Sequence, residues 1–307
     1  MDRSLFQYIS EAVDSEGKLP SGFSLPPMED EKMAIFADGA MDGINIYHMG
    51  FSPMSEEEEQ ELLKLLITAN DGDIDKATSG FASFCKKHRA VTIIDDVQDA
   101  ILNNQDDLSV QNMVRFAFHL LTETSDRECV KIGLIILELV DTSKDPDLMT
   151  VIRTMGLSDE FTLFTVFVMR HWPDGQMEIL DLAKKVHGWG RIHCVSFIEP
   201  ENDEIKKWLL LHGVDNSVLP DYSALKVFNK AGVEELLGRK DLFLEEIKGI
   251  LKIMDAMLDE GPVAGISALD SPEPVLAKVL AAANTCSGLD EEDMKIVSRI
   301  EEYKPEE

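Results

Sequence analysis

Long hydrophobic runs are missing from this sequence. A membrane-spanning helix needs roughly 18 consecutive apolar residues, and no window of the chain approaches that length. The first residues also carry charges inside their first apolar stretch, where a secretory signal would have an uninterrupted hydrophobic region. Both absences exclude the usual export and membrane signals, and they predict a cytoplasmic protein.

Cysteine is scarce as well. The four cysteines, Cys85, Cys129, Cys194 and Cys286, lie far apart and form no CxxC pair, which removes the usual zinc-ligand spacing. A chain of 307 residues can fold on its hydrophobic core without disulfides. We expect reduced thiols that pack on helices as small apolar groups.

Basic residues are outnumbered two to one. The chain has 29 lysines and arginines against 58 aspartates and glutamates, which gives a formal net charge of −29. Such a surface repels phosphate backbones and anionic membranes, so neither nucleic acid nor a membrane is an expected partner. The acidic balance suits plain solubility, and it also suits a basic protein partner.

Recognisable catalytic and cofactor motifs are absent too. The sequence has no GxSxG, no GxxxxGK[ST] and no GxGxxG after a strand, so it predicts no binding site for a nucleotide or a flavin. Residues 71–75 resemble the start of a calcium loop, but Lys76 and Ala82 stand where that loop needs glycine and glutamate. Cys85 and His88 share a helix face, yet simple packing explains them. We predict no cofactor, no metal and no catalytic residue, and we leave enzymatic activity open but disfavoured.

What the sequence does contain is a succession of helix signatures from about Ser55 to about Tyr303. Ser55 is a typical N-cap, and the four glutamates that follow complement the helix dipole. Apolar residues then recur with helical spacing. Further helices are predicted over residues 74–88, 91–103, 108–123, 126–140, 146–155, 159–171, 173–187, 189–198, 203–212, 222–231, 233–239, 241–260, 274–286 and 290–303.

The first 54 residues differ from this pattern. A short helix is predicted near residues 5–13, followed by a connector rich in proline and glycine. Residues 33–36 and 44–49 alternate in part, with two Asp-Gly turn dipeptides between them, which predicts a β-hairpin. The predicted domains are therefore an N-terminal cap over 1–54, a helical-repeat domain over 55–303 and a frayed tail over 304–307.

The helix pairs recur at roughly 30–45 residues, the period of HEAT and armadillo repeats. Residues 126–131, followed by Leu134 and Leu137, resemble the second helix of a HEAT unit, and residues 189–198 and 205–211 are similar. This resemblance implies an all-α fold, a right-handed α-solenoid of HEAT- and armadillo-like helix pairs, with the small β-hairpin as its N-terminal cap. It also implies a role in protein binding.

One region concentrates the residue types that are common at binding sites. All three tryptophans and a rare basic spot fall between residues 171 and 212, and tryptophan and arginine are enriched at binding hot spots. If consecutive helices place them side by side, they line a concave groove; the simpler interpretation is that the tryptophans fill the core. The candidate residues are His171, Trp172, Lys185, His187, Trp189, Arg191, His193 and Trp208.

The predicted function follows from the resemblance and the charge: a non-catalytic scaffold or adaptor, in one version an acidic inhibitor or immunity-type protein that binds a basic partner. The chain also resembles, in length and general texture, bacterial proteins identified as limonene hydroxylases or monooxygenases, although no motif supports this. That second resemblance implies the alternative function, an enzyme acting on a small hydrophobic molecule in a groove lined by Trp172, Trp189 and Trp208.

Overall fold

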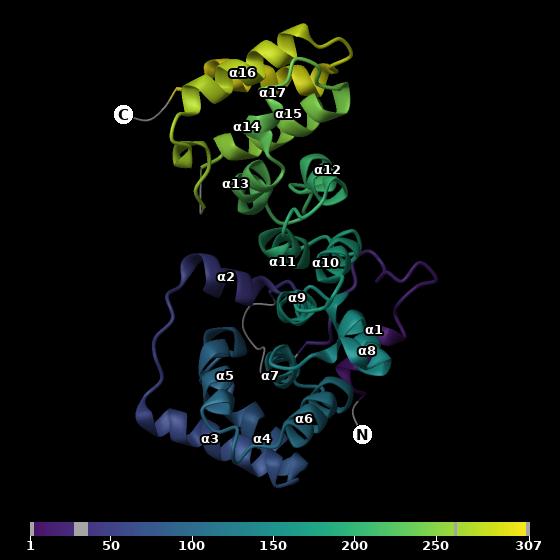
Figure 1. Ribbon diagram of the computed structural model, residues 1–307, viewed down its shortest axis with the longest axis vertical. Coiled ribbons are helices and arrows are strands. Elements are labelled where there is room, and N and C mark those ends of the chain that lie inside the picture. The colour runs from purple at the N-terminus through teal and green to yellow at the C-terminus, as the bar shows by residue number, and fades with distance from the viewer. Residues whose placement is uncertain (1–2, 28–35, 261–262, 305–307) are drawn as a thin grey trace. The chain divides into compact units, whose positions relative to one another are not determined.

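The computed structural model describes residues 3–27, 36–260 and 263–304. Regular structure in these residues is entirely helical, with seventeen α-helices and three short 3-10 helices and no strand (Figure 1), which confirms the all-α prediction. None of the helices in this part of the chain combines the length and the hydrophobicity of a membrane span. The chain divides into two units, Met1–Gly190 and Arg191–Glu307.

Unit 1 contains the first ten α-helices, and α11 starts at its last two residues. Their bounds are α1 Leu5–Ser10, α2 Ala40–His48, α3 Glu56–Asn70, α4 Ile74–Phe84, α5 Ile94–Leu102, α6 Val110–Glu123, α7 Arg127–Glu138, α8 Pro146–Gly156, α9 Thr162–Met169, α10 Gly175–Ala183 and α11 Trp189–Phe197, with 3-10 helices η1 Ala90–Thr92 and η2 Thr142–Lys144. Unit 2 holds the rest of α11 and α12 Asp203–His212, α13 Asp221–Lys230, α14 Val233–Leu236, α15 Leu244–Leu258, α16 Pro272–Thr285 and α17 Glu291–Glu302, with η3 Ile266–Ala268.

Local side-chain caps explain where several helices begin. Ser55 is the N-cap of α3, as predicted, and it forms a capping box with Glu58, because the Ser55 N–H donates to Glu58 at 2.9 Å and the Glu58 N–H donates to the Ser55 hydroxyl at 3.4 Å. Asp145 accepts from two N–H groups at the start of α8, and Asn202 accepts from the Ile205 N–H in α12. Each cap satisfies donors that the helix cannot pair internally.

Helix α7 is the centre of unit 1. Every residue from Arg127 to Leu137 is buried, and α7 packs against α4, α5, α6, α9 and η1. A side chain at Gly133 would place its Cβ 2.4 Å from Leu121 of α6, so glycine permits the close approach of these two helices. A helix that is apolar nearly all round must be covered on several sides, and these neighbours cover α7.

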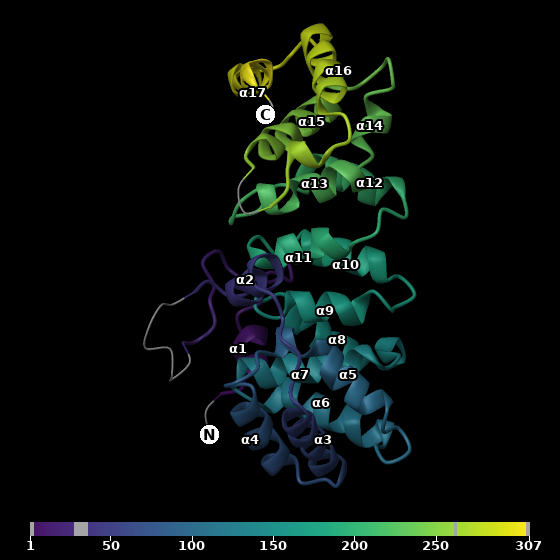
Figure 2. The same cartoon turned by 90° about the vertical axis from the view of Figure 1, so that its left-hand side faces the viewer.

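Helix α15 has the same position in unit 2. It packs against α12, α13, α16 and α17, and Figure 2 shows α12 and α13 side by side beneath it. Ile250, Leu251, Met254 and Met257 on α15 are almost completely buried, so the two methionines belong to the core.

Three of the four cysteines are buried, as expected. Cys85 and Cys129 belong to unit 1 and Cys194 to unit 2, whereas Cys286 is half-buried, and all four are free thiols. Burial raises the pKa of Cys85 and of Cys129 above the ordinary thiol range. Raised pKa values suppress the reactive thiolate, so these thiols are inert in the folded unit.

The predicted N-terminal β-hairpin is wrong for the residues that the structure describes. Residues 40–48 form α2, and residues 33–35 of the predicted first strand lie outside the described ranges. Gly39 adopts a left-handed conformation with a φ of 77° and starts the helix. Gly43 lies inside α2, and a Cβ there would fall 2.2 Å from the ring of Trp189, so the close packing of the ring on this helix requires glycine. The glycines that predicted turns instead allow a helix to pack closely.

Candidate functional site

The eight residues of the predicted groove differ in burial and in unit. Trp172, Trp189, Arg191 and His193 are buried, Lys185 and Trp208 are half-buried, and His171 and His187 are exposed. Residues 171–189 of this set belong to unit 1, and the other three belong to unit 2.

In unit 1, two of the three tryptophans serve internal packing. The Trp172 indole N–H donates to the Thr142 hydroxyl at 2.7 Å, and the guanidinium of Arg153 lies 5.2 Å from a Trp172 ring centroid. Trp189 packs beside Tyr47 of α2, with ring centroids 6.2 Å apart. The indole N–H of Trp172 thus has a hydrogen-bond acceptor, and the rings of both tryptophans pack against other side chains of unit 1.

In unit 2, the structure brings Arg191 and Trp208 together. The Arg191 guanidinium lies 5.4 Å from a Trp208 ring centroid and donates to the backbone oxygen of Asp215 at 3.0 Å. This arrangement is a cation–π contact, and it leaves Trp208 half-buried. The shared groove that was expected from all eight residues stays a prediction.

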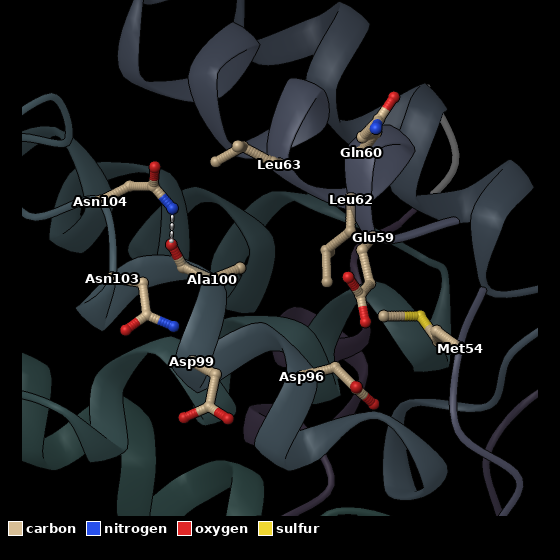
Figure 3. A pocket seen from close by; sticks show the side chains of 10 residues that line it. All are labelled: Met54, Glu59, Gln60, Leu62, Leu63, Asp96, Asp99, Ala100, Asn103 and Asn104. Atoms are coloured by element: carbon tan, nitrogen blue, oxygen red, sulfur yellow. Dashed lines mark hydrogen bonds between the residues drawn. The ribbon is translucent and has the colours of Figure 1, made fainter. Parts of the chain in front are cut away.

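An acidic pocket that the sequence did not single out lies between α3 and α5 in unit 1 (Figure 3). Its volume is about 350 Å³. Three carboxylates, three amides and four apolar side chains line it: Met54, Glu59, Gln60, Leu62, Leu63, Asp96, Asp99, Ala100, Asn103 and Asn104. We call this site the acidic pocket.

Helical spacing explains why these residues meet. Asp96, Asp99 and Asn103 follow one another at intervals of three and four residues, so they share the face of α5 that looks toward α3. Glu59 and Leu62 share the opposing face of α3 in the same way. The pattern therefore places carboxylates and the buried Leu62 in the lining of the same pocket.

The acidic pocket carries negative charge that the protein does not neutralise. Glu59, Asp96 and Asp99 form no ion pair with any described residue. Burial raises the pKa of Asp96, and the neighbouring carboxylates of Glu59 and Asp99 raise it further. The nearby amide of Asn104 is occupied, because it donates to the Ala100 oxygen at 2.8 Å. Unpaired carboxylates that repel one another favour a bound cation.

No metal centre accompanies this charge in the described part of the chain, where no group of three or more histidine, cysteine, aspartate and glutamate side chains is placed to hold a metal ion. The site can therefore offer a cationic ligand negative charge and an apolar wall. The sequence signal was present in the acidic residues at helical spacing on the predicted helix 91–103, but the glutamates of α3 were assigned only to the start of their helix.

A second concentration of charge is buried beneath α2 in the same unit. The ammonium of Lys131, which has no exposed surface, lies 2.6 Å from Glu160, 2.7 Å from Asp42 and 3.0 Å from Glu128. Arg127 adds contacts of 3.7 Å to Glu160 and 3.3 Å to Asp38. We call this set the buried ion cluster, and it ties α2 and the start of α9 to α7.

The ionisation of this cluster follows from its burial. Burial opposes the charge on Lys131, but Asp42, Glu128 and Glu160 outweigh it and raise the pKa of that lysine. Burial also raises the pKa of Asp42, to about 6, against the lowering effect of Lys131. The pKa of Glu160 is lowered, since Lys131 and the N–H of Gly39, which donates to Glu160 at 2.8 Å, outweigh its burial. The cluster links α2 and the segment before α9 to α7, so we assign it a structural role.

Comparison with protein-family models, with curated proteins and with solved structures finds no match for this chain. The resemblance to HEAT and armadillo repeats therefore stays a prediction from sequence, and the function has to be inferred from the sites themselves.

Proposed function

We propose that the protein is a non-catalytic adaptor or inhibitor that binds a basic protein partner through the acidic pocket. The observation that carries this proposal is the set of unneutralised carboxylates, Glu59, Asp96 and Asp99, around a cavity of about 350 Å³. The net charge of −29 favours the same class of partner at long range, since opposite charge speeds encounter.

A lysine or arginine side chain matches both the apolar residues and the carboxylates that line the pocket. These side chains place an apolar stem against apolar surface and keep a cationic head in a polar environment. In the acidic pocket the stem would contact Leu62, Leu63 and Met54, and the head would lie among the carboxylates. Binding would supply the cation that Asp96 lacks and would lower its raised pKa.

The helical-repeat arrangement belongs to the same proposal. Helices adjacent in the chain pack together, as in the pairs α3 with α4, α6 with α7 and α8 with α9. Within unit 1, α7 also packs on α5 and α9, and within unit 2, α15 packs on α13 and α17. Contacts between neighbouring helices and next neighbours are what stacked repeats require, and stacked repeats commonly form binding surfaces.

The test uses a fluorescein-labelled tetra-arginine amide as the probe, with binding measured by fluorescence anisotropy at low and high salt. The double variant Asp96→Asn with Asp99→Asn should bind the probe at least about tenfold more weakly, a change of about 1.4 kcal/mol. The matched control Asp147→Asn with Glu123→Gln removes the same charge from exposed positions outside the pocket and should bind normally.

The outcome decides between a specific pocket and general charge attraction. Equal weakening in the pocket variant and in the control would show that the probe binds to the acidic surface at large, and the proposed site would be withdrawn. The affinity of the native chain should also fall steeply with ionic strength.

A further inference from the structure

A groove of opposite character lies in unit 2, between the segment from α14 to the start of α15 and the end of α16. Its volume is about 660 Å³. Cationic and apolar side chains dominate its lining, which is Leu237, Arg239, Lys240, Leu242, Phe243, Leu244, Ile247, Lys278, Ala281, Ala282, Thr285, Cys286 and Ser287. We call it the cationic groove.

The charge of this groove contrasts with the rest of the chain. Three of its lining residues are basic and none is acidic, although acidic residues outnumber basic ones by 58 to 29 overall. Arg239 pairs with Glu246 at 2.9 Å, but Lys240 and Lys278 form no ion pair with a described residue. Two ammonium groups therefore remain available to an anionic ligand.

The apolar part of the groove is unusually exposed. Phe243 keeps 65% of its surface exposed and Leu244 keeps 39%, and both stand next to the buried Ile247. Adjacent large apolar side chains on a soluble surface are typical of interaction sites, and an aromatic anchor is a common hot spot.

Phe243 also breaks a local rule of helix formation. It occupies the N-cap of α15, where a serine or aspartate side chain would accept a hydrogen bond from the first turn and a phenylalanine side chain has no acceptor. Glu246 compensates in part, because it accepts from the Phe243 N–H at 2.8 Å. A residue that costs stability at an exposed position suggests that it serves another purpose.

We propose that the cationic groove binds an acidic amphipathic helix of a partner protein. The apolar stripe of such a helix would cover Phe243, Leu244 and Ile247, and its carboxylates would meet Lys240 and Lys278. Grooves between helices commonly take helices in this way. A chain with a net charge of −29 repels extended polyanions such as nucleic acids and anionic membranes, whereas a short helix presents only a few charges at the groove itself.

The experiment uses a labelled synthetic helix with leucines at positions i, i+3, i+4 and i+7 and glutamates elsewhere. One matched control peptide has lysines in place of the glutamates, and another has alanines in place of the leucines. Binding to the full chain is measured by fluorescence anisotropy. Cys286 supplies an independent readout, because it lines the groove and is half-buried while the other three cysteines are buried. Its alkylation by a maleimide should slow when the acidic helix binds.

Two variants test the residues. Phe243→Ser should weaken binding of the acidic helix at least about tenfold and should raise the Tm, since serine is the better N-cap. Lys240→Glu with Lys278→Glu should abolish the preference for the acidic over the lysine helix. The control Lys295→Glu with Lys64→Glu changes the same charge at exposed positions outside the groove and should bind normally.

Three results would overturn the proposal: equal binding of the acidic and lysine helices, unchanged alkylation of Cys286 at saturating acidic helix, or protection of Cys286 by phosphatidylglycerol vesicles and not by the helix. The last result would assign the groove to a lipid surface. Because this groove and the acidic pocket lie in different units, failure here leaves the result with the tetra-arginine probe unaffected.

Discussion

Helices α7 and α15 are each the centre of a unit, but they bury different side chains. Helix α7 buries Arg127, Glu128 and Lys131 among its apolar residues, whereas the buried positions of α15 are all apolar or glycine. Apolar burial is non-directional and tolerates rearrangement, while a buried charge needs its partners in place. The two centres should therefore respond differently to substitution and to pH.

The largest expected effect is in α7. Lys131→Met should destabilise unit 1 by about 3–5 kcal/mol, because it removes the ammonium that lies nearest to the buried Asp42 and Glu160. Each carboxylate then keeps only one guanidinium contact of 3.7 Å, Asp42 with Arg89 and Glu160 with Arg127. Urea denaturation followed by circular dichroism measures the loss. The matched variant that adds Asp42→Asn and Glu160→Gln removes the two poorly compensated carboxylate charges and should recover a large part of the lost stability. A loss under about 1 kcal/mol for the single variant would mean that the cluster is not a structural centre.

The next effect is in α15. Met254→Ala should destabilise unit 2 by about 2–5 kcal/mol through lost contacts and a residual cavity, since Met254 is fully buried. Met254→Leu keeps the volume and should cost less than about 1.5 kcal/mol. The same denaturation experiment at pH 5 and pH 7 should give equal losses, because no charge is involved. Losses that differ with pH would break the contrast with α7.

The smallest effect is the pH response of Asp42. Its pKa is raised to about 6 in the folded chain from an ordinary value of 3.8, so the folded state binds more protons than the unfolded state between these values. Stability from this group therefore rises as the pH falls through 6, by on the order of 1 kcal/mol between pH 7 and pH 5. Denaturation at both pH values should show this rise in the native chain, and Asp42→Asn should remove it.

Glu160, another buried carboxylate beside Lys131, should not contribute to stability changes between pH 7 and pH 5. Its pKa is lowered, so its contribution is lost only as the pH falls below the ordinary glutamate range, under the window of the experiment. If the native chain instead loses stability between pH 7 and pH 5 relative to Asp42→Asn, the raised pKa of Asp42 is contradicted.

Much of the fold could be predicted from short-range patterns. The Ser55 cap, the helix at residues 127–138 and the burial of Met254 all follow from signals within a few residues of each other. The β-hairpin was wrong because α2 depends on distant contacts, such as Gly43 against Trp189 and Asp42 with Lys131. Local alternation over a few residues cannot compete with such contacts.

The sites show the same division. The spacing of Asp96, Asp99 and Asn103 on one helix face can be read from the sequence, but the position of Glu59 opposite them depends on how α3 packs on α5. The cationic groove was missed for a similar reason, since Lys240 and Lys278 lie on separate elements. Tryptophan is enriched at binding hot spots, and the tryptophans were therefore assigned to a groove, yet Trp172 and Trp189 pack internally.

The rates at which the buried thiols are labelled can measure how often each unit opens. A thiol that is buried inside a helical unit reacts with a maleimide only when that unit opens, so its labelling rate reports the opening and not the surface. Burial also raises the pKa of Cys85 and of Cys129, which suppresses their reaction further. Cys85 and Cys129 would time the opening of unit 1, and Cys194 that of unit 2. Peptide mass mapping of labelled samples would thus reveal whether the two units open together or separately. The measurement uses the native chain and needs no introduced reporter.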